Sequence, residues 1–127
     1  MIRCFFYGTL LDDATRRRAA GRAVAVEPAW LDDHIVLRAR RRLYPIIVKR
    51  AGARAEGALS EPLDEAAVAA LTRYEGDEYR VVEVTVATAA GPVAAQMFAP
   101  LPGRIQPTGT RWRLETWRAA KRKTTAR

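Results

Sequence analysis

A glutamate at the end of a helical segment is the first side chain in this sequence whose position suggests chemistry. Glu75 stands seven residues after Val68 and four after Leu71, so all three share the face that an amphipathic helix buries. A carboxylate on a buried face must find hydrogen-bond partners or take up a proton, and either outcome gives a perturbed acid or base. The alternative is that Glu75 lies past the last turn and faces water, as most glutamates do.

Local signals place this glutamate at the end of a helix over residues 64–75. Asp64 is a preferred N-cap residue type, Glu65 follows in the first turn, and alanines dominate the next positions. Gly76 is suited to the left-handed conformation that ends a helix. We therefore predict that the last helical turn holds Glu75.

A second candidate for chemistry is the glycine that follows the first expected strand. Residues 2–7 alternate in type and predict a strand, which Gly8, Thr9 and Leu10 end. A glycine here lets the backbone turn sharply, so that successive N–H groups point into a concavity suited to an anion. The signal is weak alone, because Gly-Thr also ends many ordinary strands.

Two further helices are predicted on either side of these candidates. The first covers residues 14–20, and its arginines Arg16–Arg18 are expected on the solvent side. The second covers residues 111–121, where its tryptophans are expected to pack on the domain. Residues 121–127 are expected to fray.

The remaining patterns predict an α+β domain. Strands are expected at residues 2–7, 24–26, 35–37, 44–48, 54–59, 82–86 and 93–98, with a loop over 100–110. Because strands occur both as hairpins and across helical crossovers, we predict a small mixed β-barrel of five to six strands with two to three flanking helices. We divide the chain into a domain over residues 1–110 and a basic helix and tail over residues 111–127.

Composition limits the classes of function. One cysteine and one histidine leave no credible zinc cluster, and no apolar run approaches the ~20 residues that span a bilayer. We expect a cytoplasmic protein that contacts no membrane and needs no metal or cofactor. The net charge of +8 is suited to RNA, DNA or an anionic small molecule. The arginines can equally form an ordinary solvated surface that reflects genome composition. We prefer this explanation to nucleic-acid binding, because no aromatic RNA-binding signature or helix-turn-helix pattern accompanies the charge.

Four segments follow one another in the order Phe6-Tyr7-Gly8-Thr9-Leu10-Leu11, Tyr44-Pro45, Gly57-Ala58-Leu59 and Leu71-Thr72-Arg73-Tyr74-Glu75-Gly76-Asp77-Glu78-Tyr79. Together they resemble the gamma-glutamylcyclotransferase-like superfamily, and its AIG2-like bacterial branch in particular. The likeness covers about residues 2–99. It departs from the usual pattern at Leu11-Asp12-Asp13, where many relatives carry a basic residue and glycine, and this leaves the substrate open.

The resemblance implies a small mixed β-barrel and an enzyme for acyl transfer without a cofactor. The reaction cyclises the glutamyl group of a γ-glutamyl amine or amide to 5-oxoproline and releases the amine. The resemblance further implies that Glu75 is the catalytic acid/base, that Tyr79 lines the cavity, and that the loop of Tyr7, Gly8, Thr9 and Leu10 holds the substrate through backbone N–H groups.

Two other functions stay open beside this enzyme. The same cavity can serve a non-catalytic module that binds a small ligand, or the basic tail can serve a nucleic-acid-associated protein. The oligomeric state and the amine half of the substrate are undetermined by the sequence.

Overall fold

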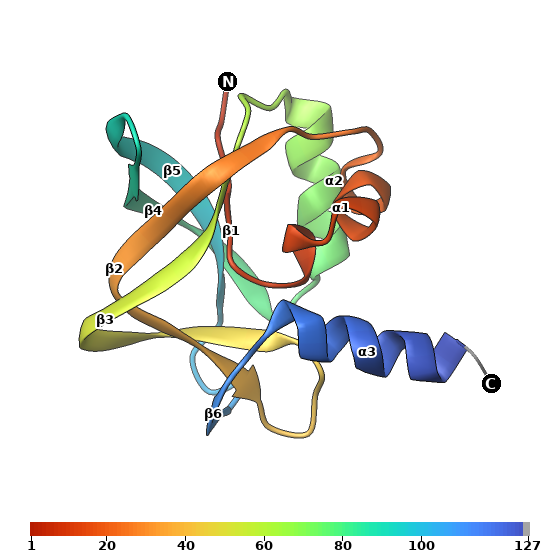
Figure 1. The fold of residues 1–127 in the computed structure, drawn as a ribbon. Helices are drawn as coiled ribbons and strands as arrows, with labels where there is room; N and C mark the ends of the chain where they lie inside the picture. Colours follow the sequence, from red (N-terminus) through yellow and green to blue (C-terminus); the bar gives the residue numbers. More distant parts are fainter. Residues whose placement is uncertain (126–127) are drawn as a thin grey trace.

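The computed structural model describes residues 1–125, which form a curled β-sheet with helices on its outside (Figure 1). The elements are β1 (Phe5–Phe6), the 3-10 turn η1 (Thr9–Leu11), α1 (Asp13–Ala20), β2 (Val26–Ala39), β3 (Pro45–Ser60), α2 (Glu65–Glu75), β4 (Tyr79–Thr88), β5 (Gly91–Pro100), β6 (Pro107–Arg111) and α3 (Leu114–Thr125).

The sheet has the strand order β1-β3-β2-β4-β5, and β6 pairs with β2. The named strand pairs are antiparallel, and one parallel bridge between Cys4 and Gln96 connects the two ends of the series. The sheet therefore curls toward a barrel without closing through a full ladder. The predicted α+β class, with six strands and three flanking helices in the described residues, is confirmed.

Strands β2 and β3 form a long bent hairpin, whereas the sequence pattern predicts shorter, separate strands over the same residues. The strands predicted at 24–26 and 35–37 are wrong as separate elements, because β2 runs through the segment between them. The two strands expected on either side of Gly52 are likewise one strand, β3. The pairing register of β2 and β3 shifts between Asp32 and His34. Two residues at this irregularity, Asp33 (φ 60°) and Gly52 (φ 80°), have positive φ angles. A bulge of this kind bends a strand without ending it.

Helix α2 matches its prediction closely. The Asp64 carboxylate accepts a 2.8 Å hydrogen bond from the Ala67 N–H group and so caps the first turn. Gly76 ends the helix at φ 81° and ψ −171°. Its positive φ is as expected, although its ψ lies outside the left-handed helical region.

The prediction for α1 is correct in extent but wrong for one arginine. Asp12 caps the helix by accepting from the Thr15 N–H group at 3.0 Å, and Gly21 ends it in the left-handed conformation. Arg17 and Arg18 face solvent as expected. Arg16 is instead 5% exposed, because its guanidinium has backbone carbonyls to bind inside the protein.

The C-terminal part contains more regular structure than its proline and glycine content predicts. The loop expected over 100–110 contains most of β6, which pairs with β2 and is held by a 2.8 Å bond from Thr108 Oγ1 to the Arg38 carbonyl. Helix α3 starts at Leu114, later than predicted, and continues to Thr125 through much of the segment expected to fray. Residues 126–127 lie outside the described residues. No helix in the described residues is long and apolar enough to cross a membrane.

Strand β1 lies between two apolar clusters. Phe6 packs in the cluster that α1 and α2 cover, with Leu71, whereas Phe5 packs in the cluster inside the curled sheet, with Leu59. The predicted alternation of faces is confirmed, although the ladder itself is limited to Phe5–Phe6. A Cβ atom on Gly57 would lie 2.2 Å from the Phe6 carbonyl oxygen, so glycine permits the close approach of β3 to β1. This packing fixes the start of the loop that follows β1.

Candidate functional site

A cavity of about 260 Å³ lies where the loop after β1, the end of α2, the start of β3 and helix α3 meet. Its lining includes Glu75, Tyr7, Gly8, Thr9, Leu10 and Tyr79, and also Phe5, Phe6, Leu43, Tyr44, Pro45, Tyr74, Glu78, Phe98 and Trp117. The six residues singled out from the sequence thus lie around a common space. Aromatic rings supply much of the remaining wall.

Glu75 is half-buried and lines the cavity, so the alternative of a fully solvated side chain does not hold. Burial raises the pKa of its carboxyl group from 4.5 to about 7. Among the described residues, no lysine, arginine or histidine forms an ion pair with Glu75. The carboxyl group can therefore gain or lose a proton near neutral pH.

Two tyrosines on the cavity wall are held through their hydroxyl groups. Tyr7 Oη donates a 2.6 Å hydrogen bond to the Phe98 carbonyl, and Tyr79 Oη donates to the Pro45 carbonyl at 3.3 Å. Burial raises the pKa of both phenols, and the nearby Glu75 charge raises it further. Both tyrosines therefore stay neutral and present their rings to the cavity.

The loop after β1 presents backbone donors. The Gly8 and Thr9 carbonyls accept from the Leu11 and Asp12 N–H groups at 2.9 and 3.1 Å, respectively. Each of these carbonyls shares a peptide plane with the N–H group of the following residue, which points the opposite way. Within the described part of the chain, the N–H groups of Thr9 and Leu10 have no acceptor. This loop therefore holds two free donors on the cavity wall.

Close packing also fixes the loop at its first residue. A Cβ atom at Gly8 would lie 2.6 Å from Pro45 Cγ at the start of β3. Glycine is therefore needed for this contact, which explains why Gly8 and Pro45 occur together at the cavity.

A second carboxylate at the cavity has the opposite character to Glu75. Glu78 Oε1 accepts from Arg42 Nη1 and lies 3.3 Å from Tyr44 Oη. The hydrogen bond from Arg42 lowers the pKa of Glu78. The pKa of Glu75 is thus raised whereas that of Glu78 is lowered, and Glu75 is the carboxyl group suited to proton transfer at neutral pH.

The sequence from residue 4 to residue 119 matches the family model described as gamma-glutamyl cyclotransferase, AIG2-like. The chain belongs to this family.

Solved structures show the same fold. The solution structure of an Arabidopsis thaliana protein has a TM-score of 0.76 at 20% identity, covering 98% of this chain and 77% of that one. A protein titled gamma-glutamyl cyclotransferase has a TM-score of 0.71 at 18% identity, covering 85% and 72%. An uncharacterised Pyrococcus horikoshii protein has a TM-score of 0.63 at 21% identity, covering 97% and 98%. No curated protein sequence is similar enough to this chain to count as a match.

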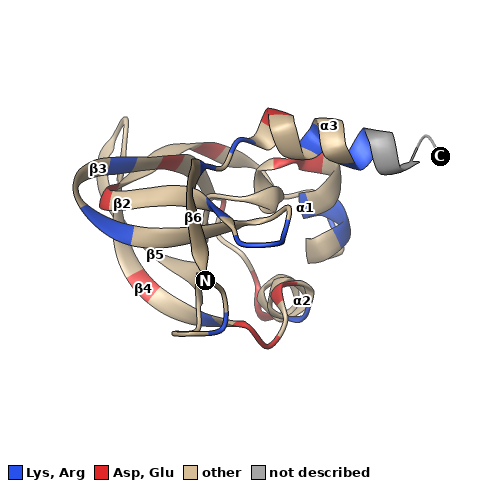
Figure 2. Ribbon diagram, turned by 90° about the horizontal axis from the view of Figure 1, so that it is seen from below, with Lys and Arg blue, Asp and Glu red and all other residues tan. Residues whose placement is uncertain are grey.

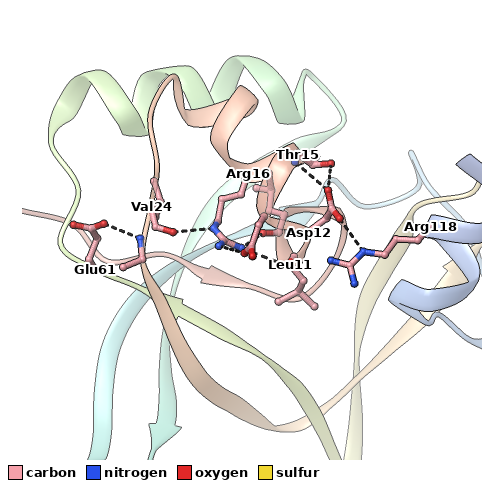
Figure 3. Close-up of polar contacts among 10 residues, drawn as sticks. Leu11, Asp12, Thr15, Arg16, Val24, Glu61 and Arg118 are labelled. Carbon is pink, nitrogen blue, oxygen red and sulfur yellow. Dashed lines mark hydrogen bonds and ion pairs between the residues drawn. The ribbon is translucent and has the colours of Figure 1, made fainter. Parts of the chain in front are cut away.

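In this AIG2-like family member, the buried Arg16 of α1 is hydrogen-bonded to backbone carbonyls outside its own helix (Figure 3). Arg16 donates to the carbonyls of Val24 and Leu10, each at 3.0 Å, and pairs with Asp13. Sequence reasoning placed Arg16 in solvent with its neighbours. The signal that distinguishes it is helical spacing, since the buried Ala19 and Ala20 lie three and four residues later on the same face.

Helix α3 supplies Trp117, a wall residue that sequence reasoning did not assign to the site. The helix is attached beside the cavity by a 2.8 Å ion pair from Arg118 Nε to Asp12 Oδ1 (Figure 3). Before the helix starts, Trp112 Nε1 donates to the Leu43 carbonyl at 2.8 Å. Figure 2 shows basic segments on both α1 and α3. No sequence pattern connects a tryptophan near the end of the chain with a loop near its start.

Cys4 and His34, whose side-chain types can also serve in catalysis, are not among the residues that line the cavity. Cys4 is buried, and burial raises the pKa of its thiol to about 11, so it is no nucleophile at neutral pH. The Nδ1 atom of His34 lies 2.8 Å from the Asp32 carbonyl on β2. In the part of the chain that the structure describes, no three His, Cys, Asp or Glu side chains are arranged to hold a metal ion.

Proposed function

We propose that this chain cyclises a γ-glutamyl amine or amide to 5-oxoproline and releases the amine, with Glu75 as general acid/base. The observation that carries the proposal is the position of Glu75. A carboxyl group with a pKa of about 7 lies in a cavity that also contains two free backbone donors. Membership of the gamma-glutamyl cyclotransferase, AIG2-like family supports the same reaction class.

Glu75 accounts for both proton transfers. Ionised Glu75 takes a proton from the substrate α-ammonium group, which becomes a nucleophile and attacks its own γ-carbonyl carbon. The C–N bond of the ring forms, and the bond to the leaving amine breaks. Protonated Glu75 then gives its proton to the leaving nitrogen, and the second proton of the former ammonium group passes to water or to the released amine. The ring closure is intramolecular, so holding the substrate in a folded shape supplies much of the acceleration.

The loop of Tyr7, Gly8, Thr9 and Leu10 holds the substrate in this proposal. The free N–H groups of Thr9 and Leu10 bind either the substrate α-carboxylate or the oxyanion that develops on the γ-carbonyl. Tyr79, which also lines the cavity, packs against the glutamyl chain. The residues assigned to the reaction require no metal or cofactor for these steps.

The test is release of 5-oxoproline, followed by mass spectrometry over γ-glutamyl amino acids, γ-glutamyl amines and glutathione. The variant Glu75→Gln keeps the shape of the side chain and cannot accept the proton, so it is expected to lose at least about 100-fold in rate. Glu65→Gln is the matched control, because Glu65 is exposed in the first turn of the same helix.

Turnover by Glu75→Gln near that of the wild type contradicts the assignment of Glu75. If the folded wild-type protein makes no product but a γ-glutamyl compound raises its melting temperature, the chain is instead a binding module with the same cavity.

A further inference from the structure

The cavity has a buried end and an open end. Phe5, Phe6 and Leu10 form a floor that is almost completely buried. Toward solvent, Leu43 is 45% exposed and lines the same cavity, and Tyr74, 43% exposed, connects this side to the loop because its Oη lies 3.0 Å from Thr9 Oγ1. A substrate bound here therefore has one end enclosed by protein and the other directed toward solvent.

The direction of the substrate follows if the proposed function holds. The glutamyl part must lie against Glu75 and the loop at Thr9, because the reacting atoms are there. The leaving amine is the part of the substrate that varies in size, and it extends to the open end. The side chains at that end, and not the catalytic residues, then decide which amine fits.

The open end is bordered by apolar and aromatic groups. Leu43, Tyr44 and Trp117 supply a leucine side chain, a phenol ring and an indole ring. The carboxylate nearby, Glu78, already accepts from Arg42 and Tyr44. Among the described residues that line this end, no unpaired carboxylate is therefore available to bind a cationic amine, and Lys121 Nζ lies 4.8 Å from the centre of the Trp117 ring, which further disfavours a second cation. Apolar side chains are available instead.

Trp117 differs from the other side chains at the open end because a separate helix carries it. Helix α3 is attached to Asp12 through Arg118, and the segment just before the helix is attached to the Leu43 carbonyl through Trp112. The indole is thus held at a fixed place on the wall without belonging to the sheet or to the reacting loop.

We propose that Trp117, held by α3, is the specificity-determining residue for the leaving amine and favours an amine with an apolar or aromatic group. The inference rests on the proposed function, because that function fixes which end of the substrate reaches the open side. An apolar contact of this size changes selectivity by about 10-fold to 200-fold.

The experiment compares γ-glutamyl-methylamide, γ-glutamyl-butylamide and γ-glutamyl-benzylamide by kcat/KM for 5-oxoproline release. The wild type is expected to prefer the benzylamide to the methylamide by at least about tenfold. Trp117→Ala is expected to remove about tenfold of this preference, mainly through KM, and to change the methylamide value less than about twofold. Trp117→Phe should retain most of the preference, since it restores a flat apolar ring.

Two further variants separate contact from general damage. Arg118→Gln keeps the indole ring of Trp117 but removes the ion pair that attaches α3 to Asp12. The preference for the benzylamide should therefore fall less than it does in Trp117→Ala. Arg122→Gln, at an exposed position on the same helix, should behave as wild type. Equal losses for all three amides in Trp117→Ala, or unchanged preference, overturn the proposal.

Failure of the role proposed for Trp117 can be distinguished from failure of the proposed reaction. If the wild type releases no 5-oxoproline from any of the three amides, the reaction assignment fails, and calorimetry measures their binding to wild type and Trp117→Ala instead. Selective loss of benzylamide affinity in the variant sustains the role of Trp117. Equal affinities, or no benzylamide binding to the wild type, overturn it.

Discussion

The Arg16 guanidinium donates a 3.0 Å hydrogen bond to the Leu10 carbonyl, which joins helix α1 to the loop that borders the cavity. A second bond of 3.0 Å reaches the Val24 carbonyl just before β2. The side chain is 5% exposed, so these bonds lie in a site that water does not reach. A buried cation thus connects a helix, the cavity loop and the approach to the longest hairpin.

Replacement of Arg16 by methionine should destabilise the protein strongly. Methionine keeps an unbranched apolar stem but leaves buried carbonyls at Leu10 and Val24 without a donor, at a cost on the order of 3 kcal/mol. Urea unfolding measures the free energy, with Arg17→Met as the control on the exposed side of the same helix. A difference between the two variants below about 0.5 kcal/mol would show that the buried bonds contribute little.

The raised pKa of Glu75 predicts how stability depends on pH. The folded protein holds this proton up to about pH 7, whereas the unfolded chain releases it near 4.5. The free energy of unfolding therefore falls as pH rises from about 4.5 to about 7, by up to about 3 kcal/mol from this group. Glu75→Gln should remove that fall, so the variant gains stability over wild type with rising pH. Parallel stability curves between pH 4 and 8 would contradict the burial of this charge.

The same group predicts the pH dependence of turnover. If ionised Glu75 takes the ammonium proton, kcat/KM should rise with pH and level off above an apparent pKa of about 7. Initial rates of 5-oxoproline release between pH 5 and 9 measure this. A midpoint near 4.5 would mean that the carboxyl group is solvated in the free enzyme.

The Asp12 carboxylate has two partners, Thr15 in α1 and Arg118 in α3, and substitution by asparagine distinguishes their contributions. Its hydrogen bonds from Thr15 and Arg118 outweigh the effect of desolvation and lower its pKa from 3.8 to about 2. Asp12→Asn keeps a good N-cap for α1 but loses the charge that pairs with Arg118, whereas Asp12→Ala also loses the cap, at about 1 kcal/mol more. Hydrogen exchange should therefore increase in α3 alone for the asparagine variant.

The pH dependence checks the same ion pair. The contribution of ionised Asp12 is present above about pH 4 and is lost as pH falls toward 2. The stability difference between wild type and Asp12→Asn should vanish over this range. A difference that persists at pH 2 would have another origin.

Gly57→Ala should disrupt the attachment of β1. The new methyl group would lie 2.2 Å from the Phe6 carbonyl oxygen and 2.8 Å from the Phe5 ring, which forces the strands apart. We expect a loss of about 3 kcal/mol or more by thermal unfolding. The control is Gly109→Ala in β6, where an added Cβ atom has no neighbour within 4 Å among the described residues. Similar melting temperatures for the two variants would contradict the close approach.

Features fixed by nearby residues are the ones that the sequence predicts well. The caps of α2 depend on Asp64 and Gly76, which act on their own backbone, and the alternating valines of β4 need only one buried face. Residues 28–33 misled the prediction, because a proline and two aspartates favour a turn unless a bulge absorbs them, as at Asp33.

Features that depend on distant partners could not be predicted from local pattern. Arg16 is buried because carbonyls outside its helix accept its protons, and β6 forms because β2 offers an edge. The gathering of Tyr7, Glu75 and Tyr79 around a cavity came from the family resemblance, and periodicity contributed only the inward face of Glu75. Their assigned roles stay predictions.

The hydrogen bond from Tyr7 to Phe98 spans 91 residues, and the ion pair from Arg118 to Asp12 spans 106. At ribosomal speeds of 5–20 residues per second, roughly 5–20 seconds separate the emergence of Tyr7 from that of Trp117. Until β5 emerges, the nascent chain carries Phe5 and Phe6 without all of the strands that bury them. The segment that becomes the cavity floor is therefore exposed to chaperones and to aggregation during that time, and the cavity is complete only after α3 has emerged.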